Sequence, residues 1–358
     1  MQALRFVRSL IVPALLSLVV YGPAVAQPSG VAALYVGEVP VDAPAGEALG
    51  DAPLRPPLLA ALNQVLVRVT GQVGADLVGD LGIDRSAALS LSLARQYRDV
   101  EVPQPDREPR TERRLRVDFD RAAIDRRLDE AGLARWGRER PEMLLWVADE
   151  GPDGARYRTP DPALDHALDQ AVFRYGLPIT RPILDAFDRI EVTPSDIRGG
   201  FAGVADAARE RYGADGVILL DLREGPRYWT GRWVWRLGDI EFGFARSGAT
   251  PSEVVELGVA RIAGALAARF AVRPGVEERR RVVVSGLDRP VHYAEVRDFL
   301  DGLTGVEAVR LLGAERDTLT FELDSSADGL QQRIELSGLL RFERHDLASG
   351  TLYYALVL

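Results

Sequence analysis

The sequence contains no lysine and no cysteine, and only three histidines occur among its 358 residues. Because cysteine is absent, the chain cannot form a disulfide, a thiolate nucleophile or a cysteine-held metal centre or cluster. The histidines His166, His292 and His345 lie far apart, and none has a second histidine three or four residues away on a helical face. We therefore predict no metal site and no cofactor.

Every one of the 44 basic residues is an arginine, and 53 acidic residues give a formal net charge of −9. No folded segment carries a basic stripe, which excludes nucleic acid as a partner, because such binding depends on neutralising phosphates. The 47% of hydrophobic and 27% of charged residues exclude a disordered or collagen-like chain. The length is that of two or three ordinary domains.

Residues 1–26 have the pattern of a secretory signal peptide. Arg5 and Arg8 precede an uncharged stretch from Leu10 to Tyr21, and small residues follow up to Ala26. The apolar stretch is shorter than the roughly 20 residues needed to span a bilayer. We therefore predict a cleaved signal and a periplasmic protein, with an uncleaved anchor as the alternative. Since no cysteine follows the cleavage site, the protein is not expected to be a lipoprotein.

Hydrophobic periodicity predicts an α+β protein of three small mixed modules. The first, residues 27–138, begins with a strand at 34–41 and a helix that ends at Gly71. A hairpin over 95–102 and 112–119 follows, with a long polar tip, and Asp120 caps a short helix. The long helix has an apolar stripe of Leu58, Leu62, Val65, Leu66 and Val69, with Arg55, Gln64 and Arg68 off this stripe.

The second module, residues 139–275, contains a continuous apolar run at Met143–Ala148. Such a run is typical of a central strand covered on both faces. Further strands are expected near 177–180, 215–220, 228–237 and 239–245, and helices over 162–175, 201–212 and 251–270.

The third module, residues 276–358, alternates as strand, helix, strand, strand, helix, strand, which predicts a ferredoxin-like sandwich. Its order resembles that of heavy-metal-associated domains. Their cysteine pair has no counterpart in Gly286–His292, so metal carriage does not follow. Secretion-system and outer-membrane assembly domains are similar small sandwiches without metal.

The segment Trp229–Arg236 is the most unusual local feature. Strand geometry puts Trp229, Trp233 and Trp235 on one face, and Tyr228, Arg232 and Arg236 on the other. Because large aromatic side chains dominate interface energetics, the tryptophan face is a candidate partner-binding surface. The alternative is that it packs beneath the helix at 251–270.

Two charged groups are weaker candidates. Asp149 and Glu150 follow the buried strand at 143–148, where α/β proteins place sites, although 149–154 also fits a solvated turn. The hairpin tip at 107–114 is either a solvated loop or a contact with anionic lipid headgroups through Arg110, Arg113 and Arg114. Ser285 lacks the glycine two residues earlier that a nucleophile elbow has. No residue is assigned a catalytic role.

Four segments carry a family resemblance: the strands Leu34–Val41 and Met143–Ala148, the helix end Val65–Gly71, and the block Arg211–Leu219. Together they resemble an uncharacterised family of exported proteobacterial proteins, domain of unknown function two thousand sixty-six, for which the helix end is the more specific marker. The resemblance implies no established activity.

The end of the last block is also similar to a helix-to-strand step in other periplasmic domains. These are domains of the curli-secretion lipoprotein, the N-terminal domain of the Tol-system propeller protein, and lipoprotein activators of penicillin-binding proteins. The resemblance implies a scaffolding or binding role.

The sequence therefore predicts a non-catalytic binding or adaptor module of the cell envelope, whose partners are envelope proteins and whose oligomeric state is not assigned. The alternative is a periplasmic hydrolase acting on an envelope polymer, with Asp149, Glu150 or the Trp229 face near its site. A deep pocket that collects carboxylates of raised pKa would favour the hydrolase. A third possibility is a membrane-surface protein that uses the arginine-rich tip.

Overall fold

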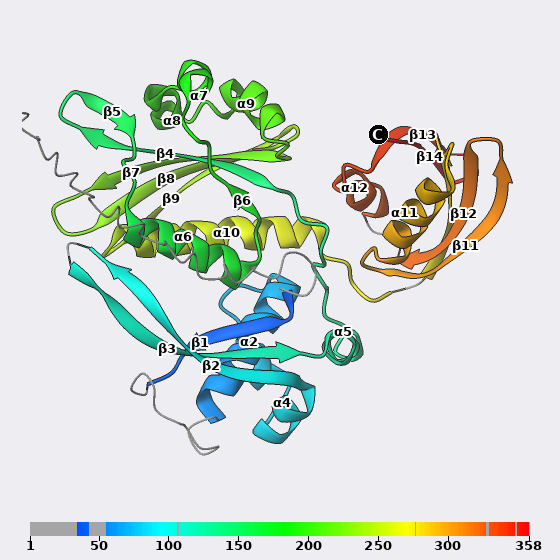
Figure 1. Cartoon of the computed structure of the whole chain (residues 1–358), viewed down its shortest axis with the longest axis horizontal. Helices are drawn as coiled ribbons and strands as arrows, with labels where there is room; N and C mark the ends of the chain where they lie inside the picture. The colour runs from blue at the N-terminus through cyan, green and yellow to red at the C-terminus, as the bar shows by residue number, and fades with distance from the viewer. Residues whose placement is uncertain are drawn as a thin grey trace, which may run out of the picture.

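The computed structural model describes residues 34–42, 55–105, 107–275, 277–326, 329–347 and 349–357. The expected signal segment at 1–26 lies outside these ranges. Within them, no helix combines the length and hydropathy needed to cross a membrane. Three sheets follow one another along the chain (Figure 1), and the α+β class predicted from the sequence is confirmed.

The first sheet places β3 between β1 and β2 in antiparallel pairing, and α2 covers it. All five residues of the predicted helical stripe are at most 1% exposed. Asp120 begins α5, as predicted, by accepting a hydrogen bond from the Ala123 amide at 3.1 Å. The elements are β1 (Val36–Pro40), α2 (Arg55–Thr70), α3 (Leu77–Asp80), α4 (Arg85–Leu91), β2 (Ser92–Gln104), β3 (Arg107–Phe119) and α5 (Arg121–Glu130).

The β2–β3 hairpin is longer than predicted. Pairing runs from Ser92 opposite Phe119 to Gln104 opposite Arg107, so the residues expected to form a long polar tip belong to β3 instead. Charges of both signs alternate along the two strands, as in the ion pair of Arg113 with Asp99 at 3.8 Å. Opposite charges across a strand pair stabilise the pairing, which explains why this polar segment is extended.

The second sheet has the order β5-β4-β7-β8-β9, and β6 joins the first part of β4. Alternate residues of β4 face two different cores, one with α6 and α10 and one with α8 and α9, so the predicted burial on both faces is confirmed. Its strands are β4 (Met143–Gly151), β5 (Gly154–Tyr157), β6 (Ile179–Thr180), β7 (Gly216–Glu224), β8 (Trp229–Leu237) and β9 (Ile240–Gly248). Its helices are α6 (Pro162–Tyr175), α7 (Ala186–Glu191), α8 (Pro194–Gly199), the 3-10 turn η2 (Ala202–Ala205), α9 (Asp206–Arg211) and α10 (Pro251–Phe270).

The third sheet has the order β11-β12-β10-β14-β13, with β10 and β14 parallel. The order β11-β12-β10-β14 is that of a ferredoxin-like sandwich, but in that fold the last strand runs antiparallel to the first, whereas β14 is parallel to β10. The additional strand β13 reverses the chain before β14, so the ferredoxin-like prediction is correct for the order of these four strands and wrong for the direction of the last one. β13 was not predicted from the sequence. Among the described residues it pairs with β14 alone, at the sheet edge, and apolar residues alternate with charged ones only over its first four positions. The elements are β10 (Glu277–Ser285), α11 (Pro290–Asp301), β11 (Val306–Glu315), β12 (Thr318–Ser326), α12 (Leu330–Glu335), β13 (Leu340–Asp346) and β14 (Thr351–Leu356).

The first module docks beneath α6 and α10 of the second (Figure 1). Gly71, at the end of α2, has a φ of +71°, and a Cβ at this position would lie 1.9 Å from the Cβ of Ala267 on α10. Glycine is therefore required here both by backbone conformation and by close approach. The helix end that carries the family resemblance is thus a docking point between modules.

Two buried arginines extend this junction. Arg68, which the sequence places off the apolar stripe of α2, is only 1% exposed because the second module packs on that side. It donates hydrogen bonds to the carbonyl oxygens of Leu34 and Val36 at 3.2 and 2.8 Å, and to that of Arg174 on α6 at 3.3 Å. Its guanidinium also lies over the ring of Phe173, 4.3 Å from the centroid.

Arg140 lies beside Arg68 and bonds only to backbone. Its guanidinium donates at 2.6–3.1 Å to five carbonyl oxygens, those of Arg68, Trp136, Gly137, Tyr175 and Gly176. Burial lowers the pKa of both arginines to about 9. The carbonyls at the C-terminal ends of α2 and α6 carry partial negative charge. This partial charge stabilises the two buried cations, as a carboxylate would in an ion pair.

We expect Arg140→Met to lower the free energy of unfolding by about 3–5 kcal/mol, because five carbonyls, two of them in buried residues and three in half-buried ones, would lose their donor. Urea denaturation followed by tryptophan fluorescence measures this loss. Arg227→Met is the matched control: this side chain is exposed in the turn between β7 and β8, so the change should stay below about 1 kcal/mol. Equal losses in the two variants would contradict the role assigned to Arg140.

Candidate functional site

The tryptophan face of β8 lies against α10. Trp233 is fully buried and Trp235 is 5% exposed. A Cβ on Gly258 of α10 would lie 2.1 Å from the Trp233 ring, so this glycine makes room for the indole. Trp229 is half-buried, with the guanidinium of Arg158 at 5.7 Å from its ring centroid. Of the three tryptophans, only Trp229 has appreciable surface to offer a partner.

The carboxylates Asp149 and Glu150 do not form a pair. They occupy consecutive positions of β4, so their side chains point to opposite faces of the sheet. Asp149 is buried and accepts hydrogen bonds from Arg156 at 2.7 Å and from Arg158 at 3.1 Å, while Glu150 is exposed and bonds to Arg198 at 2.5 Å. The solvated turn expected over 149–154 is instead a β4–β5 hairpin that turns only at residues 152 and 153.

A cavity of about 350 Å³ opens at the edge of β4, and no sequence motif indicated it. β6 pairs with the start of β4 up to Leu144, and β5 pairs with its end from Ala148, so residues 145–147 between them have no strand partner on this edge. The cavity lies at this gap. Its floor is apolar and is formed by Leu145, Val147, Leu164, Leu168, Leu220 and Val255.

Four charged residues form the rim of the cavity, and each is already paired. Arg158 bonds to Asp161 at 2.8 Å, and Arg181 bonds to Asp165 at 2.6 Å. Burial alone would raise the pKa of Asp161, but hydrogen bonds from Arg158 and from two helix amides outweigh it and lower this pKa. A carboxylate of lowered pKa is ionised at neutral pH and does not suit a general acid.

The histidines and Ser285 occupy separate places. His166 lies on α6, where burial first and Arg114 second lower its pKa, so it is neutral at pH 7. His292 is buried on α11 beside Asp288, with 3.1 Å between Nδ1 and the carboxylate, and His345 lies on β13. Ser285 ends β10 and donates to the Tyr354 carbonyl at 3.3 Å. In the ranges that the structure describes, no three metal-ligating side chains gather.

The arginines proposed for lipid contact are largely occupied within the first sheet. Arg114 is buried, with Glu112 at 2.8 Å and Glu38 at 3.6 Å. The side chain of Arg113 is 10% exposed and lies over Tyr97, and only Arg110, at 66%, is well exposed. Contact of all three with headgroups would require these internal ion pairs to break.

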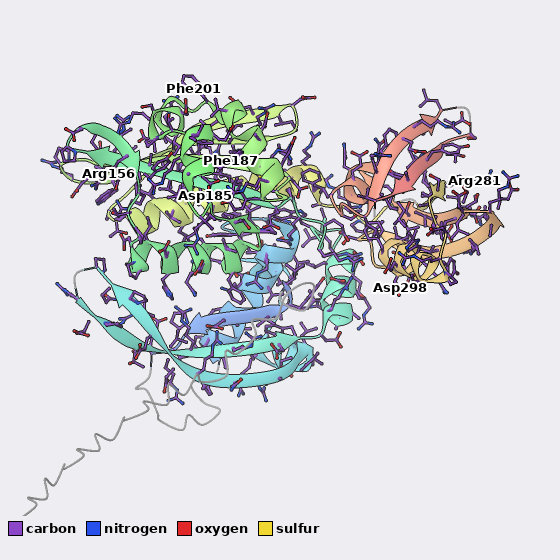
Figure 2. All side chains as sticks on the ribbon, turned by 45° about the horizontal axis from the view of Figure 1, so that its top comes forward. Arg156, Asp185, Phe187, Phe201, Arg281 and Asp298 are labelled. Carbon is purple, nitrogen blue, oxygen red and sulfur yellow. The ribbon has the colours of Figure 1, made fainter. Side chains whose placement is uncertain are left out.

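A further surface, not anticipated from the sequence, is apolar. Phe187 and Ile190 lie one helical turn apart on α7, and Ile183 precedes this helix. Phe201 directly precedes η2, and Val204 lies within it. These five side chains are 39–77% exposed, and we call this set the α7–η2 surface. Figure 2 shows Phe187 and Phe201 on this helical layer. The layer covers the face of the sheet opposite α6 and α10, away from the first module (Figure 1).

Replacing Trp233 with alanine should lower the free energy of unfolding by about 3–5 kcal/mol, because a large buried side chain is removed beneath α10. Trp229→Ala, at a half-buried position of the same strand, should cost about 1 kcal/mol or less. Chemical denaturation of the two variants measures the difference. If Trp233→Ala were as stable as the unmodified protein, its packing against α10 would not contribute to stability.

A segment within the first module matches a known family. Residues 29–137 match a family model described as Domain of unknown function (DUF8605), which covers less than a third of the chain. No curated protein and no solved structure matches the chain. The match supports an uncharacterised domain family for this segment. It does not support the family number expected from the sequence, or the similarity to curli-secretion and Tol-propeller domains.

Proposed function

We propose that this protein is an exported periplasmic adaptor that binds another envelope protein and has no catalytic activity of its own. The observation that carries the proposal is the α7–η2 surface. Five of the fifteen exposed large apolar side chains of the described chain fall within residues 183–204. Contiguous exposed apolar side chains on soluble proteins mark interaction sites.

Charged groups beside the α7–η2 surface fit the polar rim of an interface. Asp185 and Asp188 are both paired with Arg211, whose guanidinium lies 5.2 Å from the centroid of the Phe187 ring. The hydrogen bond from Arg211 lowers the pKa of Asp185 to about 2. Asp185 and Arg211 therefore keep their charges at physiological pH, and an apolar centre with a charged rim is the usual anatomy of a binding surface.

The proposal also includes export to the periplasm, a division into three domains, and two family relationships. Export rests on the composition of residues 1–26. The boundaries 27–138, 139–275 and 276–358 are supported by the presence of one sheet in each part. Membership in the family numbered two thousand sixty-six rests on the four segments quoted above. Similarity of the second module to curli-secretion and Tol-propeller domains rests on the step from α9 to β7, where Gly213 has a φ of +64°.

The alternative function is hydrolysis of an envelope polymer, and the cavity at the β4 edge is the observation that favours it. Its charged rim includes Asp161 and Asp165, and Asp149 lies behind Arg158. Turnover of purified peptidoglycan fragments that disappears in Asp149→Asn or Asp161→Asn would establish the hydrolase and overturn the adaptor. The ionised, arginine-bound state of Asp161 leads us to expect no turnover.

A photo-crosslinking amino acid at Phe187 or Phe201 tests the adaptor in cells that export the protein. We expect one crosslinked product of defined size from both positions, because both lie on the α7–η2 surface. Ile190→Asp, in the same surface, should reduce the yield at Phe201 by about tenfold or more, since a carboxylate cannot be buried cheaply in an apolar interface.

The control places the same crosslinker at Leu347, which is 84% exposed but lies after β13 in the third module. Equal products from Leu347 and Phe201 would indicate non-specific contact and reject the proposal. Circular dichroism of Ile190→Asp should match that of the unmodified protein, because Ile190 is 77% exposed.

A further inference from the structure

A groove of about 640 Å³ lies between α10 and β9, on the sheet face opposite the α7–η2 surface. Trp235, Phe242, Leu257 and Gly264 line it, and Val73 of the first module closes one side. Phe242 is 46% exposed and lies 6.5 Å from both Trp235 and Phe244, measured between ring centroids. The groove therefore presents an aromatic wall to solvent.

Three charged residues line the groove, Glu241, Arg246 and Arg261, and the two arginines give it an excess of positive charge. Arg261 of α10 lies 5.7 Å from the Phe242 ring centroid and 5.3 Å from that of Phe244, and Arg246 of β9 lies 5.4 Å from Phe244. Among the described residues, neither guanidinium has a carboxylate within 4.0 Å. In a protein of net charge −9, this leaves two cations, both close to the Phe244 ring, that an external anion would complement.

β9 also provides a backbone edge. It pairs with β8 over nine consecutive positions without a bulge, and within the described chain no strand pairs with its other side. It contains no proline, and alternate backbone groups along such an edge remain available to another chain. Phe242, Phe244 and Arg246 alternate along β9 on its groove face, so an added strand would meet aromatic rings first and positive charge next.

We propose that this groove binds an extended acidic peptide segment of a partner protein, which adds as a strand to β9. The backbone of the peptide pairs with the strand edge, apolar side chains contact Phe242 and Leu257, and carboxylates pair with Arg246 and Arg261. Strand addition obtains its affinity from main-chain hydrogen bonds and its specificity from alternate side chains. The groove is separate from the α7–η2 surface. The two binding proposals are therefore tested independently, and one can be rejected while the other stands.

A fluorescent capped octapeptide tests the proposal. Threonine occupies every second position, and the positions between hold two valines and then two glutamates, in that order along the peptide. Both this order and its reverse are titrated, because either strand direction is allowed. Fluorescence anisotropy with the purified full-length protein should show saturable binding by one order. Replacing the glutamates with glutamines should weaken it by about tenfold or more. No saturable binding of either order up to about 1 mM, or equal binding of the glutamine peptide, would overturn the proposal.

Protein variants locate the site. Arg246→Glu and Arg261→Glu should each weaken binding by about tenfold or more, and Arg269→Glu, on the same helix but outside the groove lining, should leave it unchanged. Unfolding midpoints of the three variants should agree with that of the unmodified protein, since these side chains are on the surface. If all three variants weakened peptide binding equally, the effect would be due to the net charge of the protein, and the proposed site would be rejected.

Backbone methylation separates strand addition from other binding. An added strand uses the amides of alternate residues, so N-methylation of one alternate set of the peptide should abolish binding while methylation of the other set is tolerated. Equal effects of the two sets would reject strand addition. The protein could instead bind vesicles of phosphatidylglycerol through Arg246 and Arg261 and fail to bind the peptide. That result would assign the groove to lipid and overturn the proposal.

Discussion

The two buried guanidinium groups of Arg68 and Arg140 hold the first two modules in one arrangement. They stand where α2 and α6 end, and they satisfy backbone carbonyls from β1, α2, α6 and the connection between modules. A guanidinium has five N–H donors in a fixed plane, whereas a lysine ammonium has three. At this junction, therefore, an arginine can satisfy more carbonyls than a lysine could. The groove at β9 depends on this junction, because Val73 reaches it only when α2 is docked on α10.

The arginine-only composition also governs the acidic side chains. The buried carboxylates of Asp149, Asp188 and Asp221 each face at least one guanidinium within 3.1 Å. Such pairing holds each carboxylate in a fixed position and occupies its oxygens with arginine donors. The conspicuous acidic residues of the second module are therefore parts of its framework, which agrees with a binding role.

The two faces of the second sheet offer different kinds of surface. One face carries the α7–η2 surface, which has an apolar centre beside the ion pairs of Arg211. The other carries α10, which buries Trp233 but leaves Phe242 at the edge exposed, with two guanidinium groups close to its ring or to that of Phe244. The two proposals therefore assign a folded partner to one face of this sheet and an extended segment to the other.

The sequence by itself determined the α+β class, the apolar stripe of α2, the doubly covered strand at Met143–Ala148 and the alternation of strands and helices in most of the third module. These features follow from local periodicity, because burial of an apolar face repeats every 3.6 or two residues along one element. Tertiary structure alone decided that Arg68 is buried, that β3 extends through the arginine-rich segment, and that Asp149 and Glu150 are separated. It also created the cavity at β4 and the groove at β9. Each of these depends on which distant element packs against a residue, and that information does not lie in its neighbours along the chain.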